Sequence, residues 1–182
     1  MQLLNRSPIY LRALEMTDFD NEFAWHNDSA LYDYLGGNFH WVSHLTEEEW
    51  LRQHSLYSAN EINLAICISE THEHIGNIYL RDIDWISRRA ELHLFIGNSI
   101  NRGHGYGEAA VRSILVYAFK DLRLKRIFLF VLASNAPAIS LYKKCGFLEE
   151  GRLRNHAFKN GKAEDMLIMG LLEEDWQLNT LK

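Results

Sequence analysis

The sequence predicts an α/β fold in which one mixed β-sheet carries helices on both faces. Two observations support this fold class. A segment with helical periodicity lies between the extended runs 90–96 and 126–132, and such a strand–helix–strand unit pairs in parallel through a right-handed crossover. Short polar turns separate the other extended runs, which indicates antiparallel hairpins on either side. The length of 182 residues suits a single domain over residues 1–182.

In the N-terminal part, one strand and two helices precede the first hairpin. Residues 9–14 form an apolar extended run. Thr17 and Thr46 each stand before acidic residues, a pattern typical of helix N-termini, so we expect a helix to begin at each. Residues 62–69 and 75–85 then predict two strands joined by a polar turn.

The central part changes from strand periodicity to helix periodicity. Residues 90–96 alternate between apolar and polar side chains, as a half-buried strand does. After Gly107, apolar residues recur at the spacing of one helix face as far as Leu122. Residues 126–132 are almost entirely apolar, which is typical of a central strand that is buried on both faces.

A helix and a hairpin complete the predicted fold. Asn135 precedes a helix that has Pro137 near its start and Gly146 after its end, the positions that these residues favour. Asn160 and Gly161 lie between two extended segments and predict a tight hairpin. The expected order is therefore strand, two helices, three strands, helix, strand, helix and two strands.

The charge of the chain disfavours one class of partner. The formal net charge is -5, whereas nucleic-acid-binding proteins concentrate Lys and Arg on one surface, so we expect no nucleic acid. Acidic residues gather at 18–22, 47–49, 149–150 and 173–175, where we expect solvated helix starts and loops.

The cytoplasm is the compartment that the sequence favours. Cys67 and Cys145 are too few for a disulfide scaffold, and they form no Cys-x-x-Cys pair. The N-terminus lacks the apolar run of a signal peptide, and no segment is long and apolar enough to span a bilayer. We therefore expect no membrane partner.

The segment from Arg102 to Gly107 is the most informative about function. Gly103, Gly105 and Gly107 occupy every second position between a strand and a helix. Glycine lets the backbone approach a ligand closely, and a helix start offers unpaired amides and partial positive charge. The pattern indicates an anion-binding loop suited to a pyrophosphate, although a helix start without a ligand remains an alternative. It lacks the Gly-Lys-Ser/Thr of a P-loop and the spacing of a dinucleotide fingerprint.

Together with a second segment, this loop resembles the GNAT superfamily of N-acetyltransferases. The first signature of that family, Arg/Gln-x-x-Gly-x-Gly/Ala, is matched by Arg102, Gly105 and Gly107. The second signature, Asn-x-x-Ala-x-x-Leu-Tyr-x-x-x-Gly-Phe, is matched by Asn135, Ala138, Leu141, Tyr142, Gly146 and Phe147. The resemblance covers nearly the whole chain. It implies a mostly antiparallel sheet whose central parallel strands splay apart.

Within the superfamily, the chain looks most like the branch of ribosomal-protein N-terminal acetyltransferases and spermidine (diamine) acetyltransferases. The residues that carry this likeness are Tyr10–Leu14, Ala90–Glu91, Gly146–Phe147 with Glu150–Gly151, and Asn160–Lys162 with Asp165. The resemblance implies acetyl-CoA as co-substrate, no metal requirement, a primary amine on a small molecule or peptide as acceptor, and a homodimer as a common assembly.

The resemblance also assigns residues to acetyl-CoA. The backbone of Leu94, Phe95 and Ile96 is implied to hold the pantetheine arm and polarise the thioester carbonyl. The pyrophosphate is implied to lie on the amides of Arg102, Gly103, His104, Gly105, Tyr106 and Gly107, with the Arg102 guanidinium as a further contact. Asn135 can hydrogen-bond the pantetheine arm, cap its helix, or do both.

Two residues are candidates for proton transfer. An acceptor amine is mostly protonated at neutral pH and must lose a proton before it attacks. Glu91 is the candidate base, directly or through a water, and a surface carboxylate is the alternative interpretation. His93 shares its strand face but ranks below Glu91. Tyr142 matches the tyrosine of the family that protonates the CoA sulfur, and a buried packing tyrosine is its alternative.

The acceptor itself is left open by the sequence. Asp33, Asp82, Asp84 and Glu91 could form an acidic pocket for a polyamine. Residues 35–41 depart from the acidic run that spermidine acetyltransferases have there, so a protein N-terminus or an amino sugar is an equal candidate.

A non-catalytic acyl-CoA-binding sensor is the competing hypothesis. A nucleotide-binding domain with ATP phosphates on the glycine loop is disfavoured, because the loop lacks the lysine of such a site. We interpret His72 and His74 as loop residues rather than metal ligands.

Overall fold

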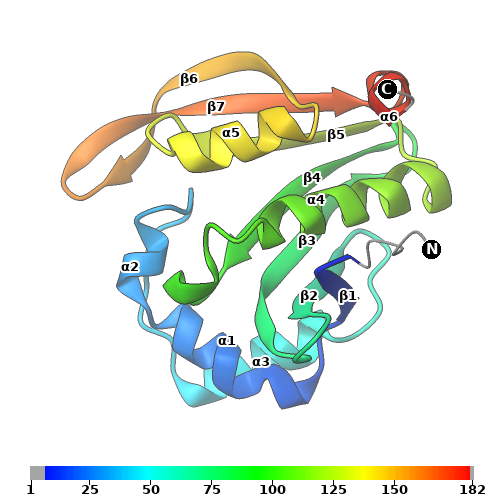
Figure 1. Ribbon diagram of the computed structural model, residues 1–182. Coiled ribbons are helices and arrows are strands. Elements are labelled where there is room, and N and C mark those ends of the chain that lie inside the picture. The colour runs from blue at the N-terminus through cyan, green and yellow to red at the C-terminus, as the bar shows by residue number, and fades with distance from the viewer. Residues whose placement is uncertain (1–6, 181–182) are drawn as a thin grey trace.

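The computed structural model describes residues 7–180 and contains a seven-stranded sheet in the order β1-β2-β3-β4-β5-β7-β6 (Figure 1). The strands are β1 (Ile9–Ala13), β2 (Ile62–Ile68), β3 (His74–Asp84), β4 (Arg89–Ile96), β5 (Arg126–Leu132), β6 (Leu148–Lys159) and β7 (Lys162–Leu172). The β4/β5 pair is parallel, and the other neighbouring pairs are antiparallel. The predicted mixed, mostly antiparallel sheet is confirmed.

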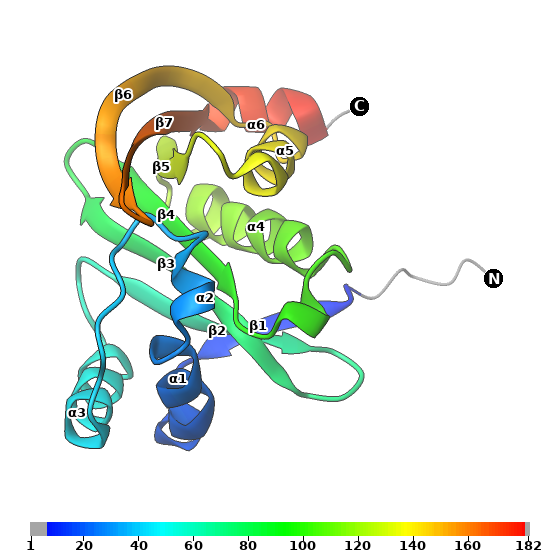
Figure 2. The ribbon, with the colours of Figure 1, turned by 90° about the vertical axis from the view of Figure 1, so that its left-hand side faces the viewer.

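Helices cover both faces of this sheet, as predicted (Figure 2). They are α1 (Phe19–His26), α2 (Ser29–Tyr32), α3 (His44–His54), α4 (Tyr106–Val116), α5 (Ala136–Lys144) and α6 (Glu173–Thr180). Helices α4 and α5 pack on one face, and α1 and α3 pack on the other. A π-helical turn over Tyr117–Asp121 extends α4. Within the described residues, no helix is both long and apolar enough to cross a membrane.

The central strands separate after a short region of pairing. Parallel pairing between β4 and β5 joins Arg89 to Arg126 and ends where Glu91 faces Phe128. Beyond this point β4 continues along β3, and β5 continues along β7. The C-terminal half of β4 therefore has no strand partner on its β5 side, and the predicted splay is confirmed.

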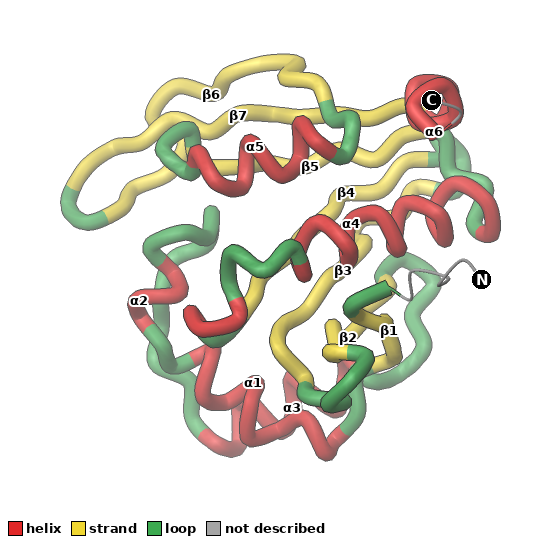
Figure 3. The backbone as a smooth tube through the Cα atoms, in the orientation of Figure 1, coloured by secondary structure: helices red, strands yellow, loops and turns green. Residues whose placement is uncertain are grey.

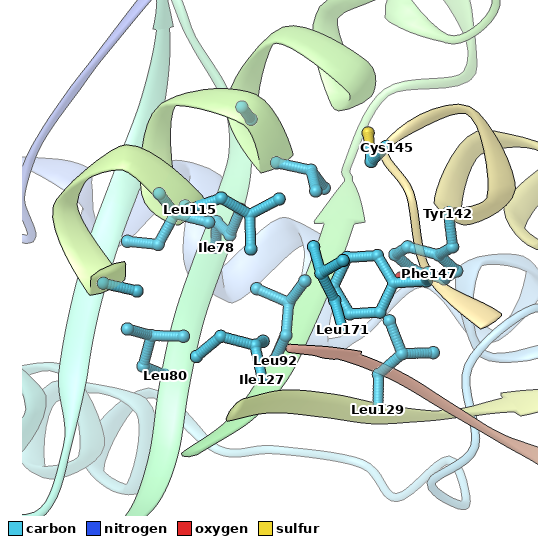
Figure 4. Packing of buried hydrophobic residues seen from close by; sticks show 14 of the residues in the cluster. Ile78, Leu80, Leu92, Leu115, Ile127, Leu129, Tyr142, Cys145, Phe147 and Leu171 are labelled. Carbon is cyan, nitrogen blue, oxygen red and sulfur yellow. The ribbon is translucent and has the colours of Figure 1, made fainter. Parts of the chain in front are cut away.

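The main core lies between α4 and the sheet. Val111, Ile114 and Leu115 project from one face of α4 and are fully or almost fully buried. They belong to one cluster with strand residues such as Ile78 and Leu92, as Figure 4 shows for several members. Full burial of each such side chain contributes about 1.5–3 kcal/mol of transfer free energy. This packing fixes the start of α4 against β4.

Two helix starts differ from the expectation. Helix α3 begins at His44, and the Ser43 hydroxyl, rather than that of Thr46, caps it by accepting from the Thr46 amide at 3.2 Å. A 3-10 turn over Met16–Asp18 precedes α1; Glu15 is its N-cap, and Asp18 at the third position accepts from the Glu15 amide at 2.9 Å, so Thr17 is not the cap. A threonine beside acids does not distinguish between neighbouring cap positions.

Several acidic residues that were expected in solvent are buried. Asp18 is 4% exposed, and Glu22 and Glu47 have no exposed surface. Asp18 accepts two hydrogen bonds from Arg12, at 2.7 and 2.6 Å. The layer formed by α1 and α3 thus buries charge where the sequence pattern predicts a solvated helix face.

The final hairpin follows the prediction closely. Asn160 and Gly161 have φ angles of 50° and 77°, which is the left-handed pair that a type I′ turn requires. They join β6 directly to β7.

Candidate active site

The glycine loop ends at the N-terminus of α4. Gly103 and Gly105 have φ angles of 79° and 81°, and a Cβ at either position would meet nothing within 4 Å. Glycine is therefore needed there for its backbone conformation rather than for space. The first helical hydrogen bond runs from the Ala109 amide to Gly105 O at 3.0 Å, so the amides of residues 106–108 precede it. This is the geometry of an anion-binding helix start.

Gly107 has a different role, which is spatial. A Cβ at this position would lie 3.0 Å from Leu141 Cδ1 of α5 and 3.6 Å from Leu94 Cδ2 of β4. The first turn of α4 is therefore pressed between the other two elements that carry the predicted site. The missing side chain lets the loop, β4 and α5 approach one another.

The Arg102 side chain turns back onto the end of β4. Its Nε donates to Ile96 O at 3.0 Å and its Nη2 to Gly97 O at 2.8 Å. The structure thus places the guanidinium where it braces the loop against β4. The neighbouring His104 ring stacks on the Tyr106 ring with centroids 5.8 Å apart. Both rings lie at the rim of the loop.

The backbone of β4 presents free groups to the splayed side. The Gly97 amide donates to Ile75 O on the β3 side at 2.9 Å. Because backbone groups alternate along a strand, those of Phe95 face β3 while those of Leu94 and Ile96 face the side vacated by β5. The Ile96 carbonyl is taken by Arg102, which leaves the N–H of Ile96 and the N–H and C=O of Leu94 for a ligand. Of the three predicted backbone positions, Leu94 and Ile96 therefore face the splayed side and Phe95 faces β3.

Tyr142 lies on α5 at the same edge of the splay. It is 7% exposed, and its ring packs edge-on against Phe147 with centroids 5.8 Å apart (Figure 4). Burial, with a smaller contribution from Cys145, raises the pKa of Tyr142 well above its ordinary value. The hydroxyl therefore stays protonated at neutral pH, as a proton donor must.

Asn135 is committed to the protein itself. Its Oδ1 accepts from the Ala138 amide at 3.1 Å and caps α5, and its Nδ2 donates to Tyr34 O at 3.1 Å. The capping alternative is therefore observed. One N–H of the amide group remains for a further acceptor.

Glu91 lies on the opposite face of the sheet from the glycine loop. Leu92 and Leu94 point toward α4, so Glu91 and His93 point toward the α1–α3 side. Glu91 occupies the last position at which β4 and β5 pair, and its side chain is 15% exposed. Glu91 Oε1 lies 3.0 Å from His93 Nε2. Glu91 and Tyr142, the two candidate proton-transfer groups, therefore lie on opposite faces of the sheet near the point where β4 and β5 part.

Cys145 does not have the properties of a nucleophile. It is 5% exposed, and burial raises the pKa of its thiol to about 11. A thiol in this state is a poor acyl acceptor. It packs in the main core, as the sequence analysis expected.

The structure does not assemble the acidic pocket that was considered for a polyamine. Asp33 lies near the β6–β7 turn, where it accepts from Asn160 Nδ2 at 3.2 Å. Asp82 and Asp84 lie at the β3–β4 turn, at the opposite end of β4, and Asp84 is used by Ser87 in that turn. Glu91 faces Arg81 across the β3/β4 pair and so lies at the same end of β4 as Asp82 and Asp84, whereas Asp33 lies at the β6–β7 turn, so the four acids do not form one group.

Sequence reasoning missed a loop that crosses toward the β6–β7 hairpin. Lys159 Nζ donates to Tyr32 O at 2.9 Å and also to Gly37 O. The loop carries an aromatic group in which Phe39 contacts both Tyr32 and Trp41 edge-on, at 5.5 and 5.0 Å between centroids. The aromatic residues within 32–41 are the sequence signal for this group. The prediction for this segment rested only on the absence of an acidic run.

His74 lies beside the polar turn, as the sequence analysis expected, but its burial was not predicted. It is the first residue of β3, it is 7% exposed, and its Nε2 lies 2.8 Å from Asn77 Oδ1. Glu22 and Glu47 lie in the same buried polar region, which no motif predicts. The spacing of four between Glu22 and His26 was the only signal in the sequence.

Comparisons with known proteins agree with this geometry. The chain is 35% identical over 102 residues to a spermidine N(1)-acetyltransferase of Vibrio cholerae, a match that spans 56% of this chain and 58% of the relative. It is 29% identical over 133 residues to YdaF of Bacillus subtilis, whose name places it provisionally among ribosomal N-acetyltransferases, across 71% of this chain and 68% of the relative. The chain thus matches little more than half the length of the first relative.

A solved structure and a family description extend the likeness to most of the chain. The structure of a spermidine N-acetyltransferase from Vibrio cholerae in complex with CoA and spermine superposes with a TM-score of 0.87 at 29% identity. That superposition covers 94% of this chain and 99% of the other. Residues 9–148 match the acetyltransferase (GNAT) domain. The chain therefore belongs to the GNAT acetyltransferase family.

Proposed function

We propose that the protein transfers an acetyl group from acetyl-CoA to a primary amine by direct attack on the thioester. The observation that carries the proposal is the splay of β4 from β5. It places the glycine loop and Tyr142 on one side of the sheet and Glu91 on the other, at the point where pairing ends. A donor and an acceptor can therefore meet from opposite faces.

The chain offers each part of acetyl-CoA a complementary group. The amides that open α4 suit the pyrophosphate, and the free N–H of Leu94 suits a carbonyl oxygen. Asn135 retains one donor for the pantetheine arm. Acetyl-CoA supplies the acetyl group as an activated thioester, and the residues described above bind and orient it.

Glu91 and Tyr142 move the protons. Glu91 takes a proton from the acceptor ammonium, directly or through a water, so that the nitrogen lone pair can attack the carbonyl carbon. The C–N bond forms as the C–S bond breaks, and Tyr142 gives its proton to the departing sulfur. As the amide forms, the nitrogen loses its second proton, which replaces through water the one that Tyr142 gave to sulfur, and Glu91 releases its proton to solvent. No covalent enzyme intermediate is required, in keeping with the buried state of Cys145.

Three classes of acceptor amine are candidates, namely a polyamine, a peptide N-terminus and an amino sugar. A polyamine is favoured by the solved relative, which holds spermine. Against this, Asp33 lies apart at the β6–β7 turn, and Asp84 is engaged by Ser87 within its own turn. The aromatic group around Phe39 suits an acceptor with apolar surface, such as a peptide N-terminus, and an amino sugar remains the third candidate.

Compartment and assembly follow the same proposal. Both cysteines are free and buried, which fits the reducing cytoplasm that we expect for this protein. A homodimer is expected from the resemblance to the family.

An amine panel tests the proposed activity. Purified protein would be incubated with acetyl-CoA and spermidine, N-terminal peptides, amino sugars or amino acids, with free thiol followed over time. We expect amine-dependent thiol release, and a fall of about 100-fold in kcat for Tyr142→Phe, because general acid catalysis contributes factors of that order or more. Tyr117→Phe, an exposed tyrosine at the end of α4, is the matched control and should keep full activity.

Two outcomes would count against this function. Binding of acetyl-CoA without amine-dependent release across the panel would favour a non-catalytic acyl-CoA sensor. Full activity in Tyr142→Phe would remove that residue from the mechanism.

A further inference from the structure

Three metal-ligating side chains converge where α1 and α3 pack against the sheet. Glu22 and His26 lie one turn apart on α1 and so share a helix face, and Glu47 comes from the first turn of α3. One potential ligand atom from each of the three lies within 4.8 Å of the other two. Both glutamates are fully buried, and the His26 side chain is 18% exposed.

Each of the two glutamates has one carboxylate oxygen without a partner. Glu22 Oε1 accepts from Asn77 Nδ2 at 2.7 Å, and Glu47 Oε2 lies 2.7 Å from His26 Nδ1. The other oxygens, Glu22 Oε2 and Glu47 Oε1, are buried and have no hydrogen-bond partner among the described residues. Buried carboxylates are stable only when they are paired, hydrogen-bonded or bound to a metal. These oxygens therefore call for a partner that the surrounding side chains do not supply.

An outer layer of hydrogen bonds holds the Glu22 carboxylate in place. Asn77, which has no exposed surface, donates to Glu22 and also to Tyr79 Oη at 2.7 Å. Its Oδ1 lies 2.8 Å from His74 Nε2. All polar atoms of the Asn77 amide group are thus engaged, and its orientation is fixed. Carboxylates that bind metals are characteristically oriented by such an outer layer.

The formal charges around the three side chains favour a doubly charged cation. Asp18 is matched by Arg12, and buried His74 lies between Asp18, at 3.2 Å, and Glu22, at 3.7 Å. When His74 is neutral and both glutamates are ionised, Glu22 and Glu47 together carry two negative charges in a region closed to solvent. One dication balances both of them and leaves His26 as a neutral nitrogen ligand, the form in which imidazole binds metals.

We propose that Glu22, His26 and Glu47 bind one divalent transition-metal ion of the zinc class. A donor set of one imidazole nitrogen and two carboxylates suits Zn²⁺ or Mn²⁺ better than Mg²⁺ or Ca²⁺, which take oxygen ligands only. Ligand atoms around zinc are about 3.3 Å apart, so the ion replaces the shorter hydrogen bond between His26 and Glu47.

The ion would link α1 to α3, the two helices between which the loop runs (Figure 3). Next to His26, the Asn27 side chain exchanges two hydrogen bonds with the Val42 backbone, each of 3.0 Å. The far part of the same loop reaches the β6–β7 hairpin through Lys159. The role of the ion is structural, since it joins α1 to α3 below the acceptor side of the sheet and takes no part in acetyl transfer.

Metal titration of the full chain tests this proposal. The protein would be treated with EDTA, freed of the chelator, and titrated with ZnCl₂ and separately with MnCl₂ by calorimetry. We expect one ion to bind per chain with at least one of the two metals. The melting temperature should then rise by roughly 5 °C at a hundredfold excess over Kd.

Variants assign the binding to these three side chains. His26→Asn and Glu47→Gln should each weaken binding at least tenfold, whereas Glu48→Gln, a neighbouring exposed carboxylate, should not. If Glu47→Gln does not fold, His26→Asn carries the test, because His26 is the least buried of the three ligands.

Two results would overturn the site. Absence of stoichiometric binding for both metals would leave a buried water or a shared proton between Glu22 and Glu47. Binding that persists in both His26→Asn and Glu47→Gln would place the ion elsewhere on the chain. Acetyl-CoA binding, measured on the same samples, separates failure of this site from failure of the proposed enzyme activity.

Discussion

The two faces of the sheet differ in what surrounds their polar groups. On the α4–α5 face, the polar groups that matter are backbone amides at a helix start, set in an otherwise apolar core. On the α1–α3 face, acids and histidines are buried beside the strands. The first arrangement suits the co-substrate acetyl-CoA and depends on the backbone geometry of the loop rather than on its side chains. The second arrangement is built from side chains, so the features that are particular to this chain lie on that face.

The largest loss of stability is expected when the Arg12–Asp18 ion pair on the α1–α3 face is broken. Asp18 is buried, so Arg12→Leu removes the guanidinium from its carboxylate, leaves only His74 beside it, and should cost about 3 kcal/mol of unfolding free energy. Urea denaturation measures this loss. The matched control is Arg52→Leu, which breaks the exposed pair with Glu49 and should cost less than about 0.5 kcal/mol. Equal losses in the two variants would show that burial on this face is not what gives the pair its strength.

The same ion pair sets a pH dependence. Burial opposes the shift, but hydrogen bonds from Arg12 and the nearby His74 lower the pKa of Asp18, so its contribution is present above about pH 4 and lost as the pH falls. Burial likewise opposes the shift at His74, where Asp18 and Asn77 raise the pKa, so that contribution is present below about pH 6.5 and lost as the pH rises.

Stability measured against pH checks both directions. Asp18 and His74 together should contribute most to the free energy of unfolding between about pH 4 and 6.5. Asp18→Asn should flatten the acid side of the profile. An unchanged acid limb in this variant would mean that other carboxylates cause the loss.

A smaller effect is expected where the glycine loop meets α5. Gly107→Val places methyl groups against Leu141 and should weaken acetyl-CoA binding about tenfold, the range expected for overpacking of 1–3 kcal/mol. Calorimetric titration with acetyl-CoA measures it. Gly37→Val, where a Cβ meets nothing within 4 Å, should bind acetyl-CoA as the parent does. Unaltered binding in Gly107→Val would mean that this close approach does not shape the site.

The smallest effect concerns the start of α3. Ser43→Ala removes the observed cap and should cost about 1 kcal/mol, whereas Thr46→Ala should cost less, because it keeps the amide that donates to the Ser43 hydroxyl and removes only the contact between the two hydroxyl groups at 2.8 Å. Thermal denaturation of the two variants compares them. A larger loss of stability in Thr46→Ala than in Ser43→Ala would mean that Thr46 caps α3, as the sequence pattern predicts.

Much of the α4–α5 side could be predicted from the sequence. Residues 126–132 form β5 with the predicted bounds, and Asn135 caps α5 as expected. These features depend on local rules, namely apolar runs, proline and glycine at helix ends, and left-handed glycines. The same rules also locate the turn at Asn160–Gly161.

The α1–α3 side could not be predicted in the same way. Whether Glu22 and Glu47 face water or the sheet depends on how α1 and α3 dock, and that docking is set by contacts distant in the sequence. The Arg102 side chain gives a second example, because its use at the end of β4 follows from the fold of the loop. Local pattern identified these residues but not their partners.

Direct transfer between bound molecules is the central claim, and single-turnover labelling tests it most directly. Protein in excess over acetyl-CoA labelled in the acetyl group would be mixed with an accepted amine and quenched at intervals. We predict that label passes to the amine without appearing on the protein, and that Tyr142→Phe slows the transfer. Labelled protein that forms and decays before the product appears would contradict direct attack and would require a nucleophile on the chain.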